Sequence, residues 1–182
     1  LSLTVDGFAQ AIASSNPATT TTQQTIVYSV IAGSGFALVD TVSGQLTGTA
    51  AGTITVTATA LANGNYNEAI TSTVVIIGKR TPTLQFSPQP NAMVVGVTQT
   101  VLATSTTMLV DNGGGISYTL VGGSGSATVD SVSGLLTALG ASTVTLNATL
   151  LGNNNYNSTL TSTLITIGKS TPSLAISSTS TS

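Results

Sequence analysis

Residues 53–61 read Thr53-Ile54-Thr55-Val56-Thr57-Ala58-Thr59-Ala60-Leu61, an alternation of hydroxyl-bearing and apolar side chains. Successive side chains of a β-strand point to opposite faces, so this order places the threonines on one face and the isoleucine, valine and alanines on the other. Residues 143–150, TVTLNATL, repeat the pattern. One face of each strand is therefore buried and the other is solvated, as in an antiparallel β-sandwich.

The repetition extends well beyond this strand. Residues 28–84 align without a gap on residues 118–174, and more than half of the aligned positions are identical. Such a pattern indicates one folding unit that was duplicated with its length preserved. Each unit is followed by the same Thr-Pro dipeptide. We therefore predict a first repeat over residues 1–80, a second over 81–170 and an orphan C-terminal strand within 171–182.

Composition narrows the class of protein. Charged residues make up 4% of the chain and hydrophobic residues 41%, the net charge is −2, and cysteine and histidine are both absent. A charge this small gives no field to attract nucleic acid, and no segment is long and apolar enough to span a bilayer. Without thiolates, imidazoles or clustered carboxylates, we expect neither an enzyme nor a cofactor.

Seven strands are expected in the second repeat, because short β-prone segments alternate there with turn signals. The expected strands are residues 83–87, 97–104, 115–121, 126–129, 135–138, 143–151 and 159–167. Seven short strands in about 90 residues suit an immunoglobulin-like sandwich. We predict an all-β chain of two tandem sandwiches of about seven strands each, the first lacking its own first strand.

Several short signatures occur in the same order in both halves. In the second half they are Ser126-Ala127-Thr128-Val129-Asp130, Ser133-Gly134-Leu135-Leu136-Thr137-Ala138, Gly152-Asn153-Asn154-Asn155-Tyr156-Asn157 and Ile167-Gly168-Lys169 before Thr171-Pro172. This series resembles the tandem bacterial immunoglobulin-like repeats of exported adhesins, surface-layer proteins and filament proteins. The resemblance implies an extracellular or cell-surface location and a role as a spacer or an adhesive module.

Two pairs of equivalent residues invite a functional reading. Asp40 and Asp130 each stand before a Ser-Gly turn, where an aspartate caps the turn, and calcium would need six to eight oxygen ligands. Tyr66 and Tyr156 are each flanked by asparagines and could stack on a carbohydrate. Because a tyrosine near the start of a late strand commonly serves as a corner residue, we expect a structural role for both tyrosines.

The two ends of the repeat pattern suggest an assembly mechanism. Leu3 and Val5 align on Met93 and Val95, so the first repeat has no counterpart of residues 81–86. We expect the resulting slot, with Leu3, Val5 and Phe8 as acceptor residues, to accept an added strand. The segment that matches the missing strand is Thr171-Pro172-Ser173-Leu174-Ala175-Ile176.

Two accounts of this register remain open. In the first, the C-terminal strand completes the first repeat of another copy, which gives a head-to-tail homopolymer. In the second, the chain is a window on a longer array whose adjacent repeats supply the strand. A window would have no reason to end after one strand, which favours the filament. The alternatives in function are spacer repeats of a long adhesin, or a module that binds a glycan or host-surface ligand through its loops.

Overall fold

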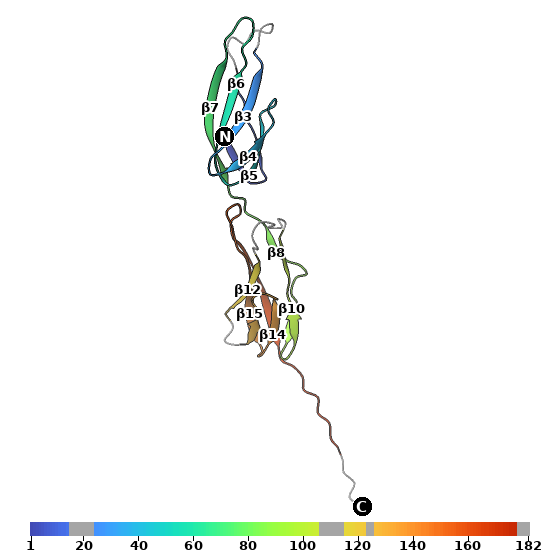
Figure 1. The fold of residues 1–182 in the computed structure, drawn as a ribbon. Helices are drawn as coiled ribbons and strands as arrows, with labels where there is room; N and C mark the ends of the chain where they lie inside the picture. Colours follow the sequence, from blue (N-terminus) through green and yellow to red (C-terminus); the bar gives the residue numbers. More distant parts are fainter. Residues whose placement is uncertain (15–23, 106–114, 123–125, 178–182) are drawn as a thin grey trace, which may run out of the picture. The chain divides into compact units, whose positions relative to one another are not determined.

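The computed structural model describes residues 1–14, 24–105, 115–122 and 126–177 (Figure 1). It divides into two compact units. Unit 1 comprises Leu1–Pro82 together with Gly152–Asn157, and unit 2 comprises Thr83–Leu151 with Ser158–Ser182. The division after Pro82 lies close to the boundary expected at residue 80. The assignment of Gly152–Asn157 to unit 1 was not expected from the sequence.

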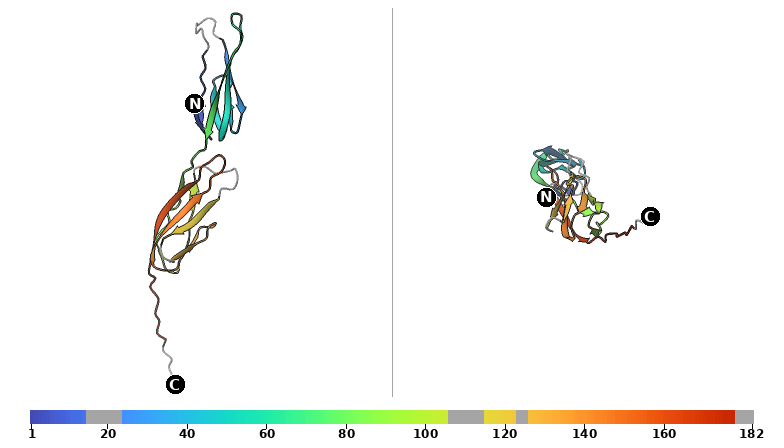
Figure 2. Two further views of the ribbon diagram at one scale, coloured as in Figure 1. Left: turned by 90° about the vertical axis from the view of Figure 1, so that its left-hand side faces the viewer. Right: turned by 90° about the horizontal axis from the view of Figure 1, so that it is seen from below.

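Unit 1 is built from two sheets, which Figures 1 and 2 show face to face. The first sheet has the order β1-β7-β6-β3 and the second β2-β5-β4. Strand β1 runs parallel to β7, and the other neighbours are antiparallel. The strands are β1 (Ser2–Thr4), β2 (Phe8–Gln10), β3 (Ile26–Ala32), β4 (Phe36–Val39), β5 (Gln45–Ala50), β6 (Gly52–Ala60) and β7 (Ala69–Gly78).

Unit 2 repeats this plan and adds a pair of strands. Its sheets have the orders β12-β15-β16-β9 and β10-β14-β13, and a further two-stranded sheet pairs β8 with β11. The strands are β8 (Leu84–Phe86), β9 (Met93–Val94), β10 (Thr98–Thr100), β11 (Ala103–Ser105), β12 (Ile116–Val121), β13 (Ala127–Val129), β14 (Leu135–Ala138), β15 (Ser142–Leu150) and β16 (Thr159–Gly168). The predicted all-β fold of sandwich repeats is confirmed.

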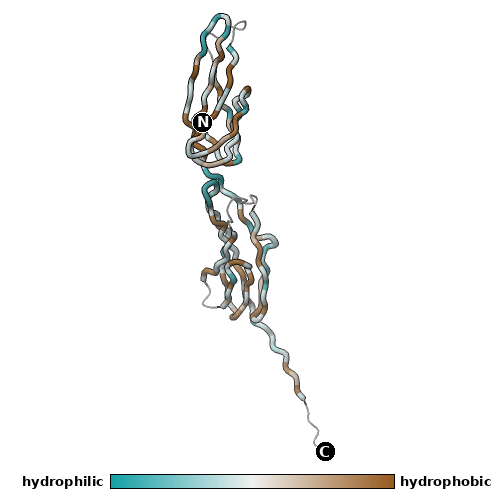
Figure 3. Tube along the Cα trace, in the orientation of Figure 1, coloured by the Kyte–Doolittle hydropathy of each residue, from teal (hydrophilic) through white to brown (hydrophobic). Residues whose placement is uncertain are grey.

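The alternating strand forms the centre of the unit 1 core. On β6, Ile54, Val56, Ala58 and Ala60 are buried, and the threonines between them are partly or fully exposed. Apolar and polar segments accordingly alternate along the strands in Figure 3. The β6–β7 register places Ile54 opposite Val75, a residue that is also buried in this core. Burial of one face of each sheet against the other stabilises the sandwich, because apolar surface is removed from water.

Across the part of the chain that the structure describes, no helix is long and apolar enough to cross a membrane.

Candidate assembly site

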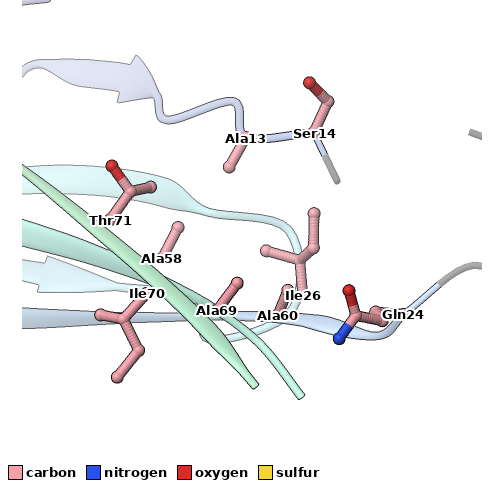
Figure 4. Close-up of a pocket in the computed structure, with 9 residues that line it drawn as sticks. All are labelled: Ala13, Ser14, Gln24, Ile26, Ala58, Ala60, Ala69, Ile70 and Thr71. Carbon is pink, nitrogen blue, oxygen red and sulfur yellow. The ribbon is translucent and has the colours of Figure 1, made fainter. Parts of the chain in front are cut away.

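Unit 1 carries an open groove at one end of its sandwich. Its two adjoining hollows have volumes of about 230 Å³ each, and Ala13, Ala58 and Thr71 line both of them. In Figure 4, Ala58, Ala69 and Thr71 point toward the segment that carries Ala13, and Ile70 points away from the groove. One wall is therefore the inward face of β6 and β7, and the other is the chain after β2. The lining combines apolar side chains with the hydroxyl and amide groups of serine, threonine and glutamine.

The equivalent place in unit 2 is filled by strand β8. Phe86 is 8% exposed and belongs to the buried core cluster, and Leu84 packs against that cluster. Strand β8 pairs antiparallel with β11, and Phe86 lies opposite Ala103. Because Ala103 is the repeat equivalent of Ala13, β8 occupies in unit 2 the position that is open in unit 1. Strand β8 also contacts β15 and β16 across the sandwich.

The effect of β8 is visible in the exposure of the facing strand. On β16, the inward residues Thr159, Thr161 and Thr163 are half-buried. Their equivalents on β7, Ala69, Thr71 and Thr73, are all exposed. The two strands have the same length and the same buried C-terminal half, so the difference is confined to the region that β8 covers.

The predicted donor segment is accessible. Residues Thr171, Pro172, Ser173, Leu174, Ala175 and Ile176 are all exposed and have no assigned strand (Figure 1). Leu174 and Ile176 are 94% and 95% exposed. Their spacing of two residues would place both on one face if the segment became a strand. The strand would then have one apolar face, formed by Leu174 and Ile176.

The acceptor residues expected from the sequence lie elsewhere in unit 1. Leu3 and Val5 are buried in the core, and β1 is already paired with β7. Phe8 is 70% exposed on β2, and none of these three residues lines the groove. The reason is that the counterpart of β8 would pair with the chain around Ala13 rather than with β1. Several groove residues are alanines, and the position of the equivalent Ala103 opposite Phe86 is what identifies this part of the groove.

Asp40 and Asp130 each close a turn in the same way. The Asp40 carboxylate accepts the N–H groups of Val42 (3.1 Å) and Ser43 (2.6 Å). The Ser43 N–H, followed by the Ser43 hydroxyl and the Val42 N–H, lowers the pKa of Asp40 below its usual value of 3.8. Asp130 is held by Ser133 and Val132, with the same effect on its pKa. Among the described residues, no three acidic, histidine or cysteine side chains gather where they could hold a metal ion.

Hydroxyl groups of tyrosine tie loops to the sandwich in both units. The Tyr28 hydroxyl accepts the Ala13 N–H at 3.0 Å, and the Tyr118 hydroxyl accepts the Ala103 N–H at the same distance. In unit 1 this contact positions the segment around Ala13, which forms one wall of the groove. In unit 2 it positions β11, the strand that pairs with β8. Both contacts involve a different pair of tyrosines from Tyr66 and Tyr156, and the sequence offered no signal that separated the two pairs.

Tyr156 belongs to the segment Gly152–Asn157 that joins unit 1. Its ring packs against the unit 1 core cluster, and its hydroxyl donates to the Asp6 carboxylate at 2.7 Å. The Arg80 guanidinium donates to the same Asp6 oxygen at 3.2 Å. Tyr66 occupies the equivalent place in the loop after β6 and is half-buried.

No protein-family description matches the chain, and no curated protein sequence matches it. Solved structures that match include a crystal structure of Drosophila N-cadherin EC1-4, with 20% sequence identity and a TM-score of 0.35. That match covers 80% of this chain and 42% of the cadherin chain. A protocadherin gammaB7 EC3-6 cis-dimer structure matches with 14% identity and a TM-score of 0.38, over 79% of this chain and 42% of that chain. The chain thus spans less than half the length of either structure.

Proposed function

We propose that the chain is an extracellular structural protein that assembles head to tail, with residues 171–176 of one copy entering the groove of unit 1 in another. The observation that carries the proposal is the contrast between the open groove of unit 1 and the same place filled by Phe86 in unit 2. The series of motifs that resembles bacterial immunoglobulin-like repeats supports a location at the cell surface. Spacer repeats of a longer adhesin, completed by their neighbours in the same chain, are the alternative.

The register of the added strand follows from unit 2. There, Phe86 lies opposite Ala103 and Gln85 opposite Thr104. The repeat offset places Ile176 opposite Ala13, and Ala175 opposite Ser14. In this register Leu174 and Ile176 face the groove as Leu84 and Phe86 do in unit 2, and Ala175 faces solvent like the exposed Gln85.

Strand addition would remove apolar surface that both partners now expose. Burial of a side chain the size of leucine or isoleucine stabilises a complex by about 1.5–3 kcal/mol. Main-chain hydrogen bonds along the groove wall add to this and fix the register. The contact joins two different surfaces, so an assembly of any length keeps one unused groove at one end and one unused donor at the other. Addition can therefore continue into an open filament.

The test compares the full chain with two charge-matched double variants. Leu174→Asp with Ile176→Asp places carboxylates in the groove, and Ser173→Asp with Ala175→Asp places them on the solvent face of the same segment. We expect the wild-type chain and the second variant to form concentration-dependent oligomers in sedimentation velocity and filaments in electron micrographs. The first variant is expected to remain monomeric. Assembly of the first variant as far as wild type, or a wild-type chain that stays monomeric, would contradict the proposal.

The register can be tested separately because the chain contains no cysteine. A chain with Ser14→Cys is mixed with a chain with Ala175→Cys under mild oxidation. Directly opposite residues of antiparallel strands have Cβ atoms about 4.5–5.5 Å apart, within reach of a disulfide. We expect a covalent heterodimer. A mixture of Ser14→Cys with Ser173→Cys should give much less of it, and equal yields would show that the register is different.

A further inference from the structure

The loops after β6 and β15 have the same internal hydrogen bonds. In the first, the Asn63 N–H donates to the Tyr66 carbonyl at 2.9 Å, and the Asn63 side-chain oxygen accepts the N–H groups of Asn65 (2.9 Å) and Tyr66 (3.0 Å). In the second, Asn153 makes the same three bonds at 2.9, 2.8 and 2.9 Å. The two loops therefore share one set of internal hydrogen bonds, and the Gln24 side chain also holds the first loop by donating to the Asn67 carbonyl at 2.8 Å.

The second loop uses this shape to bind the rest of unit 1. The Asn155 side-chain oxygen accepts the Ala51 N–H at 3.0 Å. Asn155 and Asn157 pair with the Arg80 backbone, whose N–H donates to the Asn155 carbonyl at 3.0 Å and whose carbonyl accepts the Asn157 N–H at 2.9 Å. Lys79 donates to the Asn153 carbonyl at 2.8 Å. Every asparagine used here recurs in the first loop.

The surface that receives the second loop also recurs, at one end of unit 2. Ala51, Lys79 and Thr81 have the equivalents Ala141, Lys169 and Thr171, all of them exposed. In unit 1, Thr81 accepts a hydrogen bond from the Asn157 side chain at 2.9 Å. This end of unit 2 therefore repeats most of the groups that hold a loop of this kind in unit 1.

Two groups of that surface do not recur. Asp6, which accepts hydrogen bonds from Tyr156 and Arg80, is replaced by Gly96, and Arg80 is replaced by Ser170. The backbone has a positive φ at both positions, 57° at Asp6 and 88° at Gly96. Aspartate is among the few residues that tolerate this left-handed region. The end surface of unit 2 is thus a version of the unit 1 surface without its carboxylate.

We propose that the loop of residues 63–67 in one copy docks on the end surface of unit 2 in a second copy, formed by Gly96, Ala141, Lys169, Ser170 and Thr171. The inference rests on the proposed head-to-tail assembly, because the donor segment leaves unit 2 at this surface. It adds a second contact between copies. Asn65 would accept the Ala141 N–H, Lys169 would donate to the Asn63 carbonyl, and the Tyr66 hydroxyl would meet no carboxylate.

The experiment restores the missing carboxylate and asks whether Tyr66 responds to it. A dye-labelled donor chain, with or without Gly96→Asp, is held at a concentration too low for self-association. It is titrated with an acceptor chain that carries Leu174→Asp and Ile176→Asp and therefore cannot donate. The acceptor is used with Tyr66, with Tyr66→Phe, or with Gly64→Asn, the matched control that copies the residue of the second loop.

We expect Gly96→Asp to tighten the Kd about tenfold with the Tyr66 acceptor, since a hydrogen bond to a charged group is stronger than one between neutral groups. The gain should disappear with the Tyr66→Phe acceptor and persist with Gly64→Asn. An unchanged Kd, or an equal gain with Tyr66→Phe, would overturn loop docking and leave strand addition intact. A wild-type donor that binds no acceptor would overturn both proposals, and a Leu174→Asp, Ile176→Asp donor that binds as well as wild type would overturn strand addition alone.

Discussion

Unit 1 and unit 2 share their strand order and much of their sequence, yet their cores differ at one end. Tyr118 and Ala148 of unit 2 belong to the same buried cluster as Phe86. Their equivalents Tyr28 and Ala58 are also buried, at 8% exposure each, but they lie outside the unit 1 core cluster. In unit 2 the core cluster therefore includes the residues beside β8, whereas their equivalents in unit 1 are separate from the core cluster. The comparison shows which part of the unit 2 core depends on strand β8.

The largest expected effect comes from removing that strand's main anchor. Phe86→Ala should lower the free energy of unfolding of unit 2 by about 3–5 kcal/mol, because it deletes a buried aromatic side chain and leaves a cavity. Hydrogen exchange measured by mass spectrometry would assign the loss to peptides of unit 2. Exchange in β6 and β7 of unit 1 should be unchanged.

The matched control for this prediction is Ile176→Ala. Ile176 is the repeat equivalent of Phe86 and is 95% exposed, so its truncation should leave the stability of both units unchanged in dilute, monomeric protein. If Ile176→Ala destabilises the monomer as much as Phe86→Ala, the segment is packed within its own chain. Strand donation to another copy would then be wrong.

A smaller effect is expected where each unit ties its strand wall to a tyrosine. Tyr118→Phe leaves the Ala103 N–H without its acceptor in a buried place and should cost about 1–2 kcal/mol in the stability of unit 2. Tyr28→Phe removes the same bond beside the open groove, where the contact is only partly buried and water can replace the hydroxyl. Its cost should be under about 1 kcal/mol. Urea denaturation of each variant measures the difference, and equal costs would show that the open groove does not solvate this contact.

The sequence predicted the repetitive, local part of this fold well. The strands expected at 135–138, 143–151 and 159–167 match β14, β15 and β16 closely, because alternation and turn residues act over short distances. The strand expected over residues 97–104 is two strands, β10 and β11, which pair in different sheets. The Val101 N–H still donates to the Gly134 carbonyl on the β14 side, whereas the Leu102 carbonyl accepts the Ser87 N–H on the β8 side, so the chain changes its partner between these two residues. Pairing partners that lie far apart in the sequence cannot be inferred from the local alternation of side chains.

The candidate site was harder to predict than the fold. Register alone identified the missing strand and the donor segment, and these remain predictions about assembly. The groove residues were missed because Ala13, Ala58 and Ala69 have nothing in their identity that separates them from other alanines of the chain. The Asp6–Tyr156 contact joins residues that are 150 positions apart. Asp6 stands where the second repeat has Gly96. Only the departure of Asp6 and Arg80 from the repeat pattern could have indicated it.

The smallest effect should be the same in both units, because the same hydrogen bonds cap the two turns. Hydrogen bonds from Ser43 and Ser133 lower the pKa of Asp40 and Asp130 below 3.8 in the folded chain. A carboxyl whose pKa is lowered by folding contributes stability that is fully present above its unfolded pKa and is lost as the pH falls through its folded pKa. We expect Asp40→Ala and Asp130→Ala each to remove a small stabilisation at pH 7, and we expect the difference from wild type to shrink as the pH falls through the lowered folded-state pKa of each carboxyl. Carbon-detected NMR titration of the two carboxyls would measure their pKa values, and unequal shifts would show that β8 influences more of unit 2 than the region it covers.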